Sequence, residues 1–324
     1  MKLVIVPEAA VREVLTLDLA FESVSRAFIS VADAEARVLP VVQADGGAPA
    51  SGFGIKTATV LSAGLLGFKI GSYFPDNEAH GLPNHGSTTM LLDAETGLPR
   101  ALVSAGRLNG FRTAAANAVA VSRLARDDAS TLGVLGAGHQ AEFEVRAVAA
   151  RRPIARVVLW SRSLDRAQHL AHTLRDLPCT CEVVTAPQHA VEGVDILTTV
   201  TPSTRALVEA AWVAPGTHIS AMGADAPGKQ ELDPDLLANA QAFADLPEQS
   251  ATIGEFQHPV REGRLDHAHI VPIGDVLAGR HHGRDGRTSI TVFDSSGVAP
   301  QDLYCAAAVL EAATARGLTT SLEF

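Results

Sequence analysis

The stretch TLGVLGAGHQAEF (131–143) decides the fold of the larger part of this chain. Apolar, strand-forming residues come first, a glycine turn follows, and a helical segment begins directly after the turn. In this GxGxxA pattern, Gly136 permits a tight turn and Gly138 lets the backbone approach a pyrophosphate. Ala141 allows the helix and the strand to pack closely, and the helix N-terminus supplies amide donors for an anion. The stretch therefore predicts a dinucleotide-binding turn.

Strands and helical segments alternate after this turn. Helices are predicted at 139–151 and 163–175, and strands at 156–160, 181–184, 195–200, 217–222, 240–245 and 289–294. Alternation at this spacing is typical of a parallel sheet with crossover helices. We therefore expect an α/β fold with a doubly wound, Rossmann-type parallel sheet.

The first third of the chain has a different rhythm. A strand is predicted at 2–6 and a helix at 17–31, and residues 37–104 are short β-like runs separated by turn residues, as in an antiparallel sheet. Further helices are predicted at 112–126 and 300–316. We expect residues 1–112, with the C-terminal helix of 300–324, to form a β-rich α+β domain for substrate binding and dimerisation. Residues 113–299 would form the dinucleotide-binding domain.

The composition excludes several classes of function. Lys and Arg number 26 against 36 Asp and Glu, a net charge of -10 over 324 residues, which argues against a nucleic-acid partner. Three cysteines cannot form a disulfide framework and fit a reducing compartment. The N-terminus carries charge too early for a signal peptide, and no apolar run approaches the ~20 residues of a membrane span. We expect a cytoplasmic protein without a membrane partner.

The end of the second predicted strand bears on the choice of cofactor. A site specific for NADH usually carries Asp or Glu there, to hold the ribose 2′-hydroxyl. This chain has Ser161 and Arg162 instead, which could receive a 2′-phosphate, so NADPH is favoured over NADH. A solvated surface arginine is the alternative interpretation of Arg162.

Candidate substrate-binding residues lie in the β-rich third. Lys69 stands among apolar and small residues in GFKIG, so it is either an edge residue or aimed into a cleft. Arg112 precedes the predicted Ala-rich helix and could grip a carboxylate with two hydrogen bonds.

Asp225 follows a strand of the second half, where ligands of open α/β sheets bind, and could exchange a proton there. A loop aspartate making an Asx-turn is the alternative for Asp225.

Several segments together resemble the ornithine cyclodeaminase/mu-crystallin family over nearly the whole chain. They are GFKIGSYFPDN (67–77), GLPN (81–84), TGLPRAL (96–102), LNGFRTAAANAVA (108–120), GAGHQAEF (136–143), VDILTTVT (194–201), AMGADAPGKQEL (221–232) and ITVFDSSG (290–297). The family includes cyclising deaminases, ketimine reductases, alanine dehydrogenases and NADPH-dependent binding proteins.

The resemblance implies roles for individual residues. Lys69 and Arg112 would contact the substrate's carboxylate and reacting centre, and Asp225 would be the acid–base group facing the nicotinamide. Asn84 stands where the cyclodeaminases use a threonine near the nicotinamide, and Arg37 would be a substrate-binding arginine. The dinucleotide site would comprise Asn84, Arg112, Gly136, Gly138, His139, Gln140, Ser161, Arg162, Thr201, Met222, Gly223, Lys229 and Ser295.

Two features narrow the substrate within the family. Lys56 stands where ornithine cyclodeaminase carries an acidic residue for the distal amine, and a cation there would repel ornithine and attract a second carboxylate. A surface strand lysine is the alternative interpretation of Lys56. The segments GLPNHGST, GAGHQ, GKQEL and IGEFQH resemble the family's iminosuccinate reductase branch.

The expected activity is reduction of a small imino acid by NADPH or NADH, with iminosuccinate, which yields aspartate, as the leading substrate. Lys56, with His85 or Arg37, would hold the distal carboxylate. The alternatives are ornithine cyclodeamination, reduction of a cyclic ketimine such as pyrroline-2-carboxylate, alanine dehydrogenation, and non-catalytic NADPH-dependent binding as in mu-crystallin. A homodimer is expected by the resemblance, and no metal site is expected because His267 and His269 lack a third ligand nearby.

Overall fold

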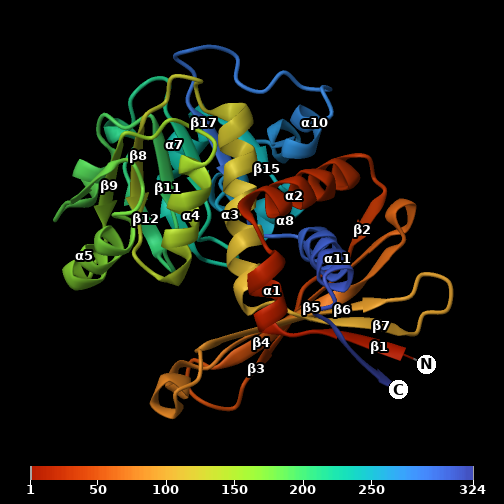
Figure 1. The fold of residues 1–324 in the computed structure, drawn as a ribbon. Helices are drawn as coiled ribbons and strands as arrows, with labels where there is room; N and C mark the ends of the chain where they lie inside the picture. Colours follow the sequence, from red (N-terminus) through yellow and green to blue (C-terminus); the bar gives the residue numbers. More distant parts are fainter. Residues whose placement is uncertain (1, 324) are drawn as a thin grey trace. The chain divides into compact units, whose positions relative to one another are not determined.

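A computed structural model describes residues 2–323, which divide into two compact units (Figure 1). One unit runs to Arg112 and resumes at Val298, and the other extends from Thr113 to Gly297. We describe each unit by itself. Within the described residues, no helix combines the length and the apolar character needed to cross a bilayer.

The first unit is built on a mixed sheet, which in the described residues has eight strands. Its order is β18-β1-β7-β6-β5-β4-β2, with β3 also paired to β4. The β1–β7 pair is parallel and the other pairs are antiparallel. The strands are β1 (Lys2–Val6), β2 (Ala36–Val38), β3 (Val42–Asp45), β4 (Gly52–Val60), β5 (Leu65–Tyr73), β6 (His85–Leu92), β7 (Pro99–Ser104) and β18 (Thr320–Glu323).

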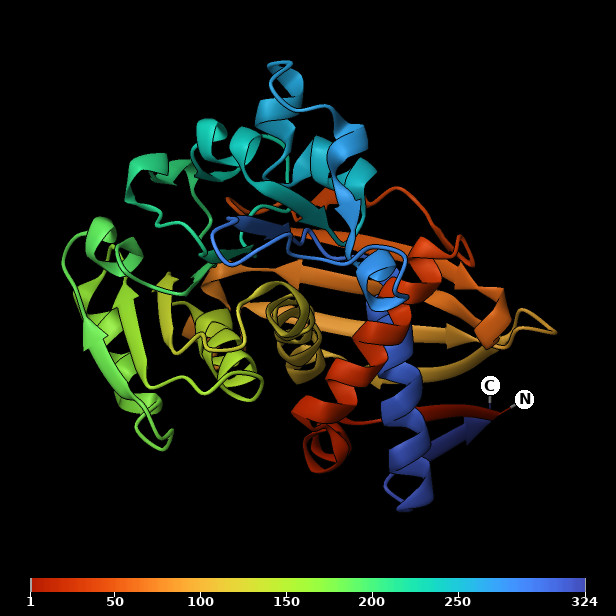
Figure 2. The ribbon, with the colours of Figure 1, turned by 90° about the horizontal axis from the view of Figure 1, so that it is seen from above.

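Helices cover one face of this sheet. They are α1 (Glu8–Val14), α2 (Leu17–Ala32) and α11 (Ala299–Ala315), with 3-10 turns η1 (Leu61–Ala63) and η2 (Pro75–His80). Figures 1 and 2 show α2 and α11 side by side, and α11 also contacts β4 and β5. Ala58 and Val60 are buried, whereas Phe53, an odd number of residues away on β4, is 40 % exposed. Since side chains alternate along a strand, the helix-covered face is the core and the other face is partly open.

Helix α3 (Gly106–Leu124) begins earlier than the sequence predicts, so the predicted position of Arg112 relative to this helix is wrong. The sequence places Arg112 at the very start of the predicted helix (112–126), but the structure places it inside α3, six residues after Gly106. The cause is a tertiary contact, because the carboxylate of Glu8 accepts from the Arg107 backbone N–H at 3.3 Å and from the Ser104 hydroxyl at 2.7 Å. A carboxylate at a helix start satisfies amides that have no partner within the helix.

The second unit contains a parallel sheet, of eight strands in the described residues, ordered β10-β9-β8-β11-β13-β17-β15-β16. Its strands are β8 (Thr131–Leu135), β9 (Arg156–Trp160), β10 (Thr180–Val183), β11 (Ile196–Thr199), β13 (His218–Ala221), β15 (Gln241–Ala244), β16 (Val271–Pro272) and β17 (Thr291–Asp294). A separate parallel pair joins β12 (Thr204–Val208) to β14 (Gln230–Leu232). The order, which reverses between β8 and β11, is that of the doubly wound fold predicted from the sequence.

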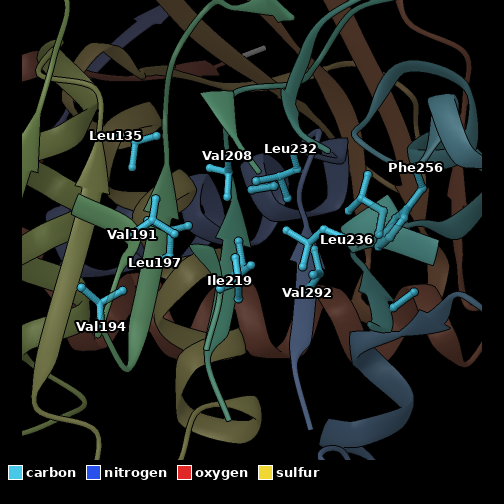
Figure 3. Close-up of a cluster of buried hydrophobic side chains, with 14 of the residues drawn as sticks. Leu135, Val191, Val194, Leu197, Val208, Ile219, Leu232, Leu236, Phe256 and Val292 are labelled. Carbon is cyan, nitrogen blue, oxygen red and sulfur yellow. The ribbon is translucent and has the colours of Figure 1, made fainter. Parts of the chain in front are cut away.

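Short helices connect these strands. They are α4 (His139–Ala149), α5 (Leu164–Thr173), α6 (Pro187–Val191), α7 (Pro234–Asn239), α8 (Pro247–Ile253), α9 (Gln257–Arg261) and α10 (Ile273–Leu277), with 3-10 turns η3 (Ala210–Trp212) and η4 (His267–His269). Figure 3 shows the apolar cluster on the sheet, where Leu197, Ile219 and Val292 come from neighbouring parallel strands. Continuous burial of β11, β13 and β17 is typical of a parallel sheet covered on both faces.

Candidate active site

Three charged side chains and one amide form a buried cluster in the first unit. Lys69, on β5 in the interior of the sheet, donates from Nζ to Asp302 Oδ1 at 3.0 Å and to Asn109 Oδ1 at 2.9 Å. Arg112 donates from Nη2 to Asn109 Oδ1 at 2.8 Å, and its Nε lies 3.0 Å from Asp302 Oδ1. Lys69, Arg112 and Asp302 are 6 %, 8 % and 2 % exposed. Lys69 is therefore not an edge residue but part of an ion-pair network.

Lys56 adds a further cation to this face of the sheet. The antiparallel register places Lys56 on β4 directly opposite Lys69 on β5, so the two side chains share a face. Burial, followed by the charge of Arg112, lowers the pKa of Lys69 to about 7, with Lys56 lowering it further and Asp302 opposing the shift. Burial opposes ionisation of Asp302, but Lys69 and Arg112 outweigh it and hold its pKa below the usual range.

Buried polar atoms without partners mark the same face. Asp302 Oδ2, Ser87 Oγ and Thr89 Oγ1 are buried and find no hydrogen-bond partner among the described residues. On β6, Thr89 lies opposite Lys69 and Ser87 opposite Gly71, so both hydroxyls share the face of Lys69. Because buried polar atoms normally have partners, this concentration is typical of a surface that binds a polar ligand.

The structure places two other residues predicted for the substrate, Arg37 and His85, and one predicted for the cofactor, Asn84, less centrally. Arg37 is exposed on β2 opposite Thr59, three residues along β4 from Lys56, so strand alternation puts it on the other face from Lys56. His85 is exposed at the start of β6, with its ring 4.7 Å from that of Tyr73. Asn84 Oδ1 accepts from the Glu78 backbone N–H at 3.1 Å, which fixes the turn before β6.

The glycine turn of the second unit fits a dinucleotide. Gly136 has φ +122°, and a Cβ there would lie 2.6 Å from the carbonyl oxygen of Val200. Gly138 is the N-cap of α4, no side-chain hydrogen bond caps the helix there, and a Cβ would meet nothing within 4 Å. The turn thus needs glycine at 136 for its own shape and keeps space at 138 for a pyrophosphate on the helix N-terminus. His139 and Gln140 begin α4, and Gln140 donates to Glu144 at 2.7 Å.

The ribose end of this site lies after β9. Ser161 Oγ accepts from the Ser163 backbone N–H at 3.3 Å, and Ser163 Oγ caps α5 by accepting from the Arg166 N–H. Arg162 is exposed. These contacts order the turn and leave a cation, without a carboxylate, at the end of the strand.

The segments after β11, β13 and β17 carry the remaining predicted residues. Asp225 is exposed and forms an ion pair with Lys229, whose Nζ also donates to the Gly223 carbonyl oxygen at 3.3 Å. Thr201 Oγ1 accepts from the Ser203 backbone N–H at 3.2 Å, and Met222 is buried. Ser295 is buried and donates to Asp245 Oδ2 at 3.0 Å, so its hydroxyl has a partner within the unit.

The sequence analysis missed Asn109 and Asp302. Asn109 precedes Arg112 by three residues, a spacing that places both on one face of a helix, and this signal could have been found. Asp302 follows the turn after β17 in a separate part of the chain, and nothing local in the sequence links it to Lys69. Only the return of α11 to the sheet brings it there.

Comparisons with known proteins find relatives that match nearly the whole chain. A profile of the ornithine cyclodeaminase/mu-crystallin family matches residues 3–317. The iminosuccinate reductase of Paracoccus denitrificans is 38% identical over 321 residues, covering 99% of this chain and 100% of that protein. Its crystal structure with NAD+ has a TM-score of 0.94 at 37% identity, covering 100% of both chains.

Two further solved structures are similar over both units. An archaeal alanine dehydrogenase, described as a dimer with bound NAD, has a TM-score of 0.93 at 33% identity and covers 100% of both chains. The Δ1-pyrroline-2-carboxylate reductase of Thermococcus litoralis, in complex with NADH and L-proline, has a TM-score of 0.91 at 27% identity and covers 99% of both chains.

Proposed function

Since this chain belongs to the ornithine cyclodeaminase/mu-crystallin family, we propose that it is an NAD(P)-dependent oxidoreductase that reduces the C=N bond of a small imino acid. The leading substrate is iminosuccinate and the product aspartate. The similarity to the reductase of Paracoccus denitrificans supports this choice, and so does the charge of the Lys69 cluster.

The observation that carries the substrate proposal is the pairing of Lys56 with Lys69. Like charges directly opposite one another on neighbouring strands destabilise a sheet, and here one of the two lysines is also buried. With Arg112, three cationic side chains act on this face of the sheet, and in the described residues Lys69 and Arg112 share the carboxylate of Asp302. A ligand with two carboxylates would balance the positive charge of this face and raise the pKa of Lys69 on binding. Ornithine carries a distal cation, so its binding would add positive charge instead.

The proposal gives each residue a task. Arg112 and Lys69 hold the α-carboxylate, and Lys56 attracts the distal carboxylate. Asp225 keeps the imine nitrogen protonated, so that the carbon is electrophilic when hydride arrives and the nitrogen retains its proton in the amine. The turn at Gly136 and Gly138 holds the pyrophosphate of the dinucleotide. When bound, the reduced nicotinamide supplies the hydride.

Turnover of a substrate panel tests the proposal. Purified protein is mixed with oxaloacetate and ammonia, with pyruvate and ammonia, with pyrroline-2-carboxylate or with ornithine, and each reduced nicotinamide is tried. Oxidation of NADH or NADPH fastest with oxaloacetate and ammonia, and formation of aspartate, is expected. Preferential turnover of pyrroline-2-carboxylate would move the assignment to a cyclic ketimine reductase. Release of ammonia from ornithine without net cofactor oxidation would move it to a cyclodeaminase.

The variant Lys56→Glu tests the distal contact. It restores the acidic charge that the resemblance places at this position in ornithine cyclodeaminase, so the second carboxylate of iminosuccinate would be repelled. We expect kcat/KM for iminosuccinate to fall about tenfold or more, with a smaller change for the imine of pyruvate, which lacks that carboxylate. Equal losses on both substrates would remove Lys56 from the distal site.

The variant Asp225→Asn separates an enzyme from a binding protein. An amide cannot exchange the proton, so imine reduction should be lost while NAD(P)H affinity is nearly kept. A wild-type protein that binds NADPH tightly, and reduces none of the panel, would instead be a binding protein of the mu-crystallin type.

We further propose that two copies of the chain pair through the open face of the first unit's sheet. Phe53 and Ile70 are 40 % and 39 % exposed on this face, and Ile55 lies opposite Ile70 across β4 and β5. An apolar face of this kind usually marks an interface. A second copy is the chosen occupant because the similar archaeal alanine dehydrogenase is described as a dimer.

A further inference from the structure

Glu231 is a buried carboxylate between two loops of the second unit. It lies on β14 and has no exposed surface. Its Oε1 accepts from the Thr201 backbone N–H at 2.6 Å, in the loop after β11. Its Oε2 accepts from the Gly223 backbone N–H at 3.0 Å, in the loop after β13, and from the Thr199 hydroxyl at 2.8 Å. One side chain thus ties together the ends of two parallel strands.

The two loops are also in close contact with each other at Gly223. A Cβ at this position would lie 2.3 Å from the Thr201 carbonyl oxygen and 2.4 Å from Glu231 Oε2. Glu231 Oε2 could not move aside without breaking its hydrogen bonds to Gly223 and Thr199, and the Thr201 oxygen belongs to the backbone. Glycine is therefore required at 223 if Glu231 is to reach both loops.

The position of these loops in the fold indicates what they serve. The pyrophosphate turn follows β8, and the adenosine ribose is expected at the end of β9, on one side of the turn. Strands β11 and β13 lie on the other side of β8, so the loops that follow them face the nicotinamide half of a dinucleotide. Asp225, the proposed acid–base group, is two residues from Gly223 on the second loop.

We propose that Glu231 is a positioning residue, which holds the loops after β11 and β13 in the arrangement that receives the nicotinamide end of the cofactor. This inference rests on the proposed function only in requiring that the chain bind NAD(P)H. It assigns a task to a side chain that touches neither the substrate nor the reacting atoms.

The neighbours of Glu231 are other buried carboxylates. Glu255 accepts from the backbone N–H groups of Glu231 and Leu232 at 2.7 Å and 3.1 Å. Asp294, at the end of β17, accepts from the Glu255 N–H at 3.1 Å, and Asp245 adds its charge beside Asp294. Burial raises the pKa of Glu231 to about 7, against the hydrogen bonds it accepts. A proton on Glu231 would convert one of its accepting oxygens into a hydroxyl, so the link between the loops should weaken as the pH falls below 7.

Binding of NADH and of ADP-ribose, measured by titration calorimetry on the full chain, tests the inference. ADP-ribose contains the pyrophosphate and adenosine but lacks the nicotinamide. In Glu231→Gln the amide presents N–H where a backbone N–H must be accepted, so NADH affinity should fall about tenfold or more, with ADP-ribose affinity within about twofold of the wild type. The exposed Glu209→Gln, which removes the same charge from the same unit, should change neither.

A second variant and a pH series complete the test. Gly223→Ala forces the loops apart by another route and should give the same selective loss, which guards against a folding defect in one variant. NADH affinity of the wild type should fall from pH 8 to pH 6 relative to that of ADP-ribose, and Glu231→Gln should lack this dependence. Equal weakening of both ligands, or no change in either, would overturn the inference. A wild type that binds no NADH would refute the proposed function itself, which is a separate and recognisable outcome.

Discussion

The most informative residue of the proposed substrate site is Lys69, because its surroundings oppose its charge. A lysine is rarely this buried without a partner, and Asp302 supplies only one carboxylate for Lys69 and Arg112 together. Its pKa of about 7 means that the positive charge is lost and gained near neutral pH. The charge that we propose attracts an anionic substrate is therefore itself sensitive to pH.

The inhibition constant of a non-reacting dicarboxylate such as succinate should depend on pH through Lys69. Since burial lowers the pKa of this lysine to about 7, the free site loses a positive charge as the pH rises from 6 to 8. The inhibition constant should begin to rise near pH 7, which gives a break in its pH profile. Lys69→Met should be inhibited weakly at every pH and should lack this break. If the break persists in Lys69→Met, a titratable group other than Lys69 causes it.

Asp302→Asn should destabilise the first unit and move the same break. Removing the carboxylate leaves two buried cations without a counter-ion, which costs about 3–5 kcal/mol. Because Asp302 raises the pKa of Lys69, its loss should shift the break in the inhibition constant below pH 7. Urea unfolding measures the stability, and the exposed Glu311→Gln on the same helix is the control. Unchanged stability in Asp302→Asn would contradict the ion-pair network.

At the scale of the element, the turn between β8 and α4 separates two uses of glycine. Gly136 is required by the backbone, because its φ is positive and a side chain would strike Val200. Gly138 has an ordinary φ of -81° and open space around it, so nothing in the fold itself requires glycine there. Gly136 is therefore needed for the fold, and Gly138 for binding of the proposed ligand.

Substitution of the two glycines should therefore have opposite signatures. Gly138→Ala should keep the wild-type melting temperature within a few degrees and weaken NADH binding about tenfold or more, since its methyl group enters the pyrophosphate space. Gly136→Ala should lower the melting temperature, because strain and a clash with the backbone are added together. Differential scanning calorimetry and cofactor titration measure both effects. Normal NADH affinity in Gly138→Ala would place the pyrophosphate elsewhere.

At the scale of the whole molecule, the open face of the first unit's sheet is the surface through which we propose that two copies pair. Its helix-covered face is closed by residues from both ends of the chain, and the pairing of β18 with β1 ties the C-terminal segment to the first strand. The other face keeps large apolar side chains partly exposed. A second copy would bury this surface, at a gain of roughly 25 cal/mol for each Å² of apolar area.

Sedimentation should therefore show twice the mass of one 33.8 kDa chain at micromolar concentration. Ile70→Asp places a charge in the proposed interface and should give a monomer. Leu164→Asp is the matched control, because Leu164 is 47 % exposed on α5 of the other unit. A dimer that persists in Ile70→Asp would place the contact on another surface. A monomeric wild type would rule out the proposed dimer.

The sequence alone predicted the features that depend on local pattern. The strand, turn and helix at 131–143 were recognisable because glycine requirements and alternating elements are encoded within a few residues, and the structure has them as β8 and α4. Lys69 and Arg112 were found because an isolated cation among apolar residues is a local signal. The C-terminal helix and the alternation of strands were found for the same reason.

Only the tertiary structure decided what depends on partners distant in sequence. Glu8 sets the true start of α3, and β18 pairs with β1 across nearly the whole chain. Asp302 reaches Lys69 over 233 residues, and Glu231 binds two loops that the sequence shows as separate. A buried charge needs a partner in space, and the chain supplies that partner from whichever segment the fold brings near. The sequence therefore determined the cofactor turn and the cations of this protein. Folding determined the partners of these features, which are the counter-ion Asp302 and the loop-binding carboxylate Glu231.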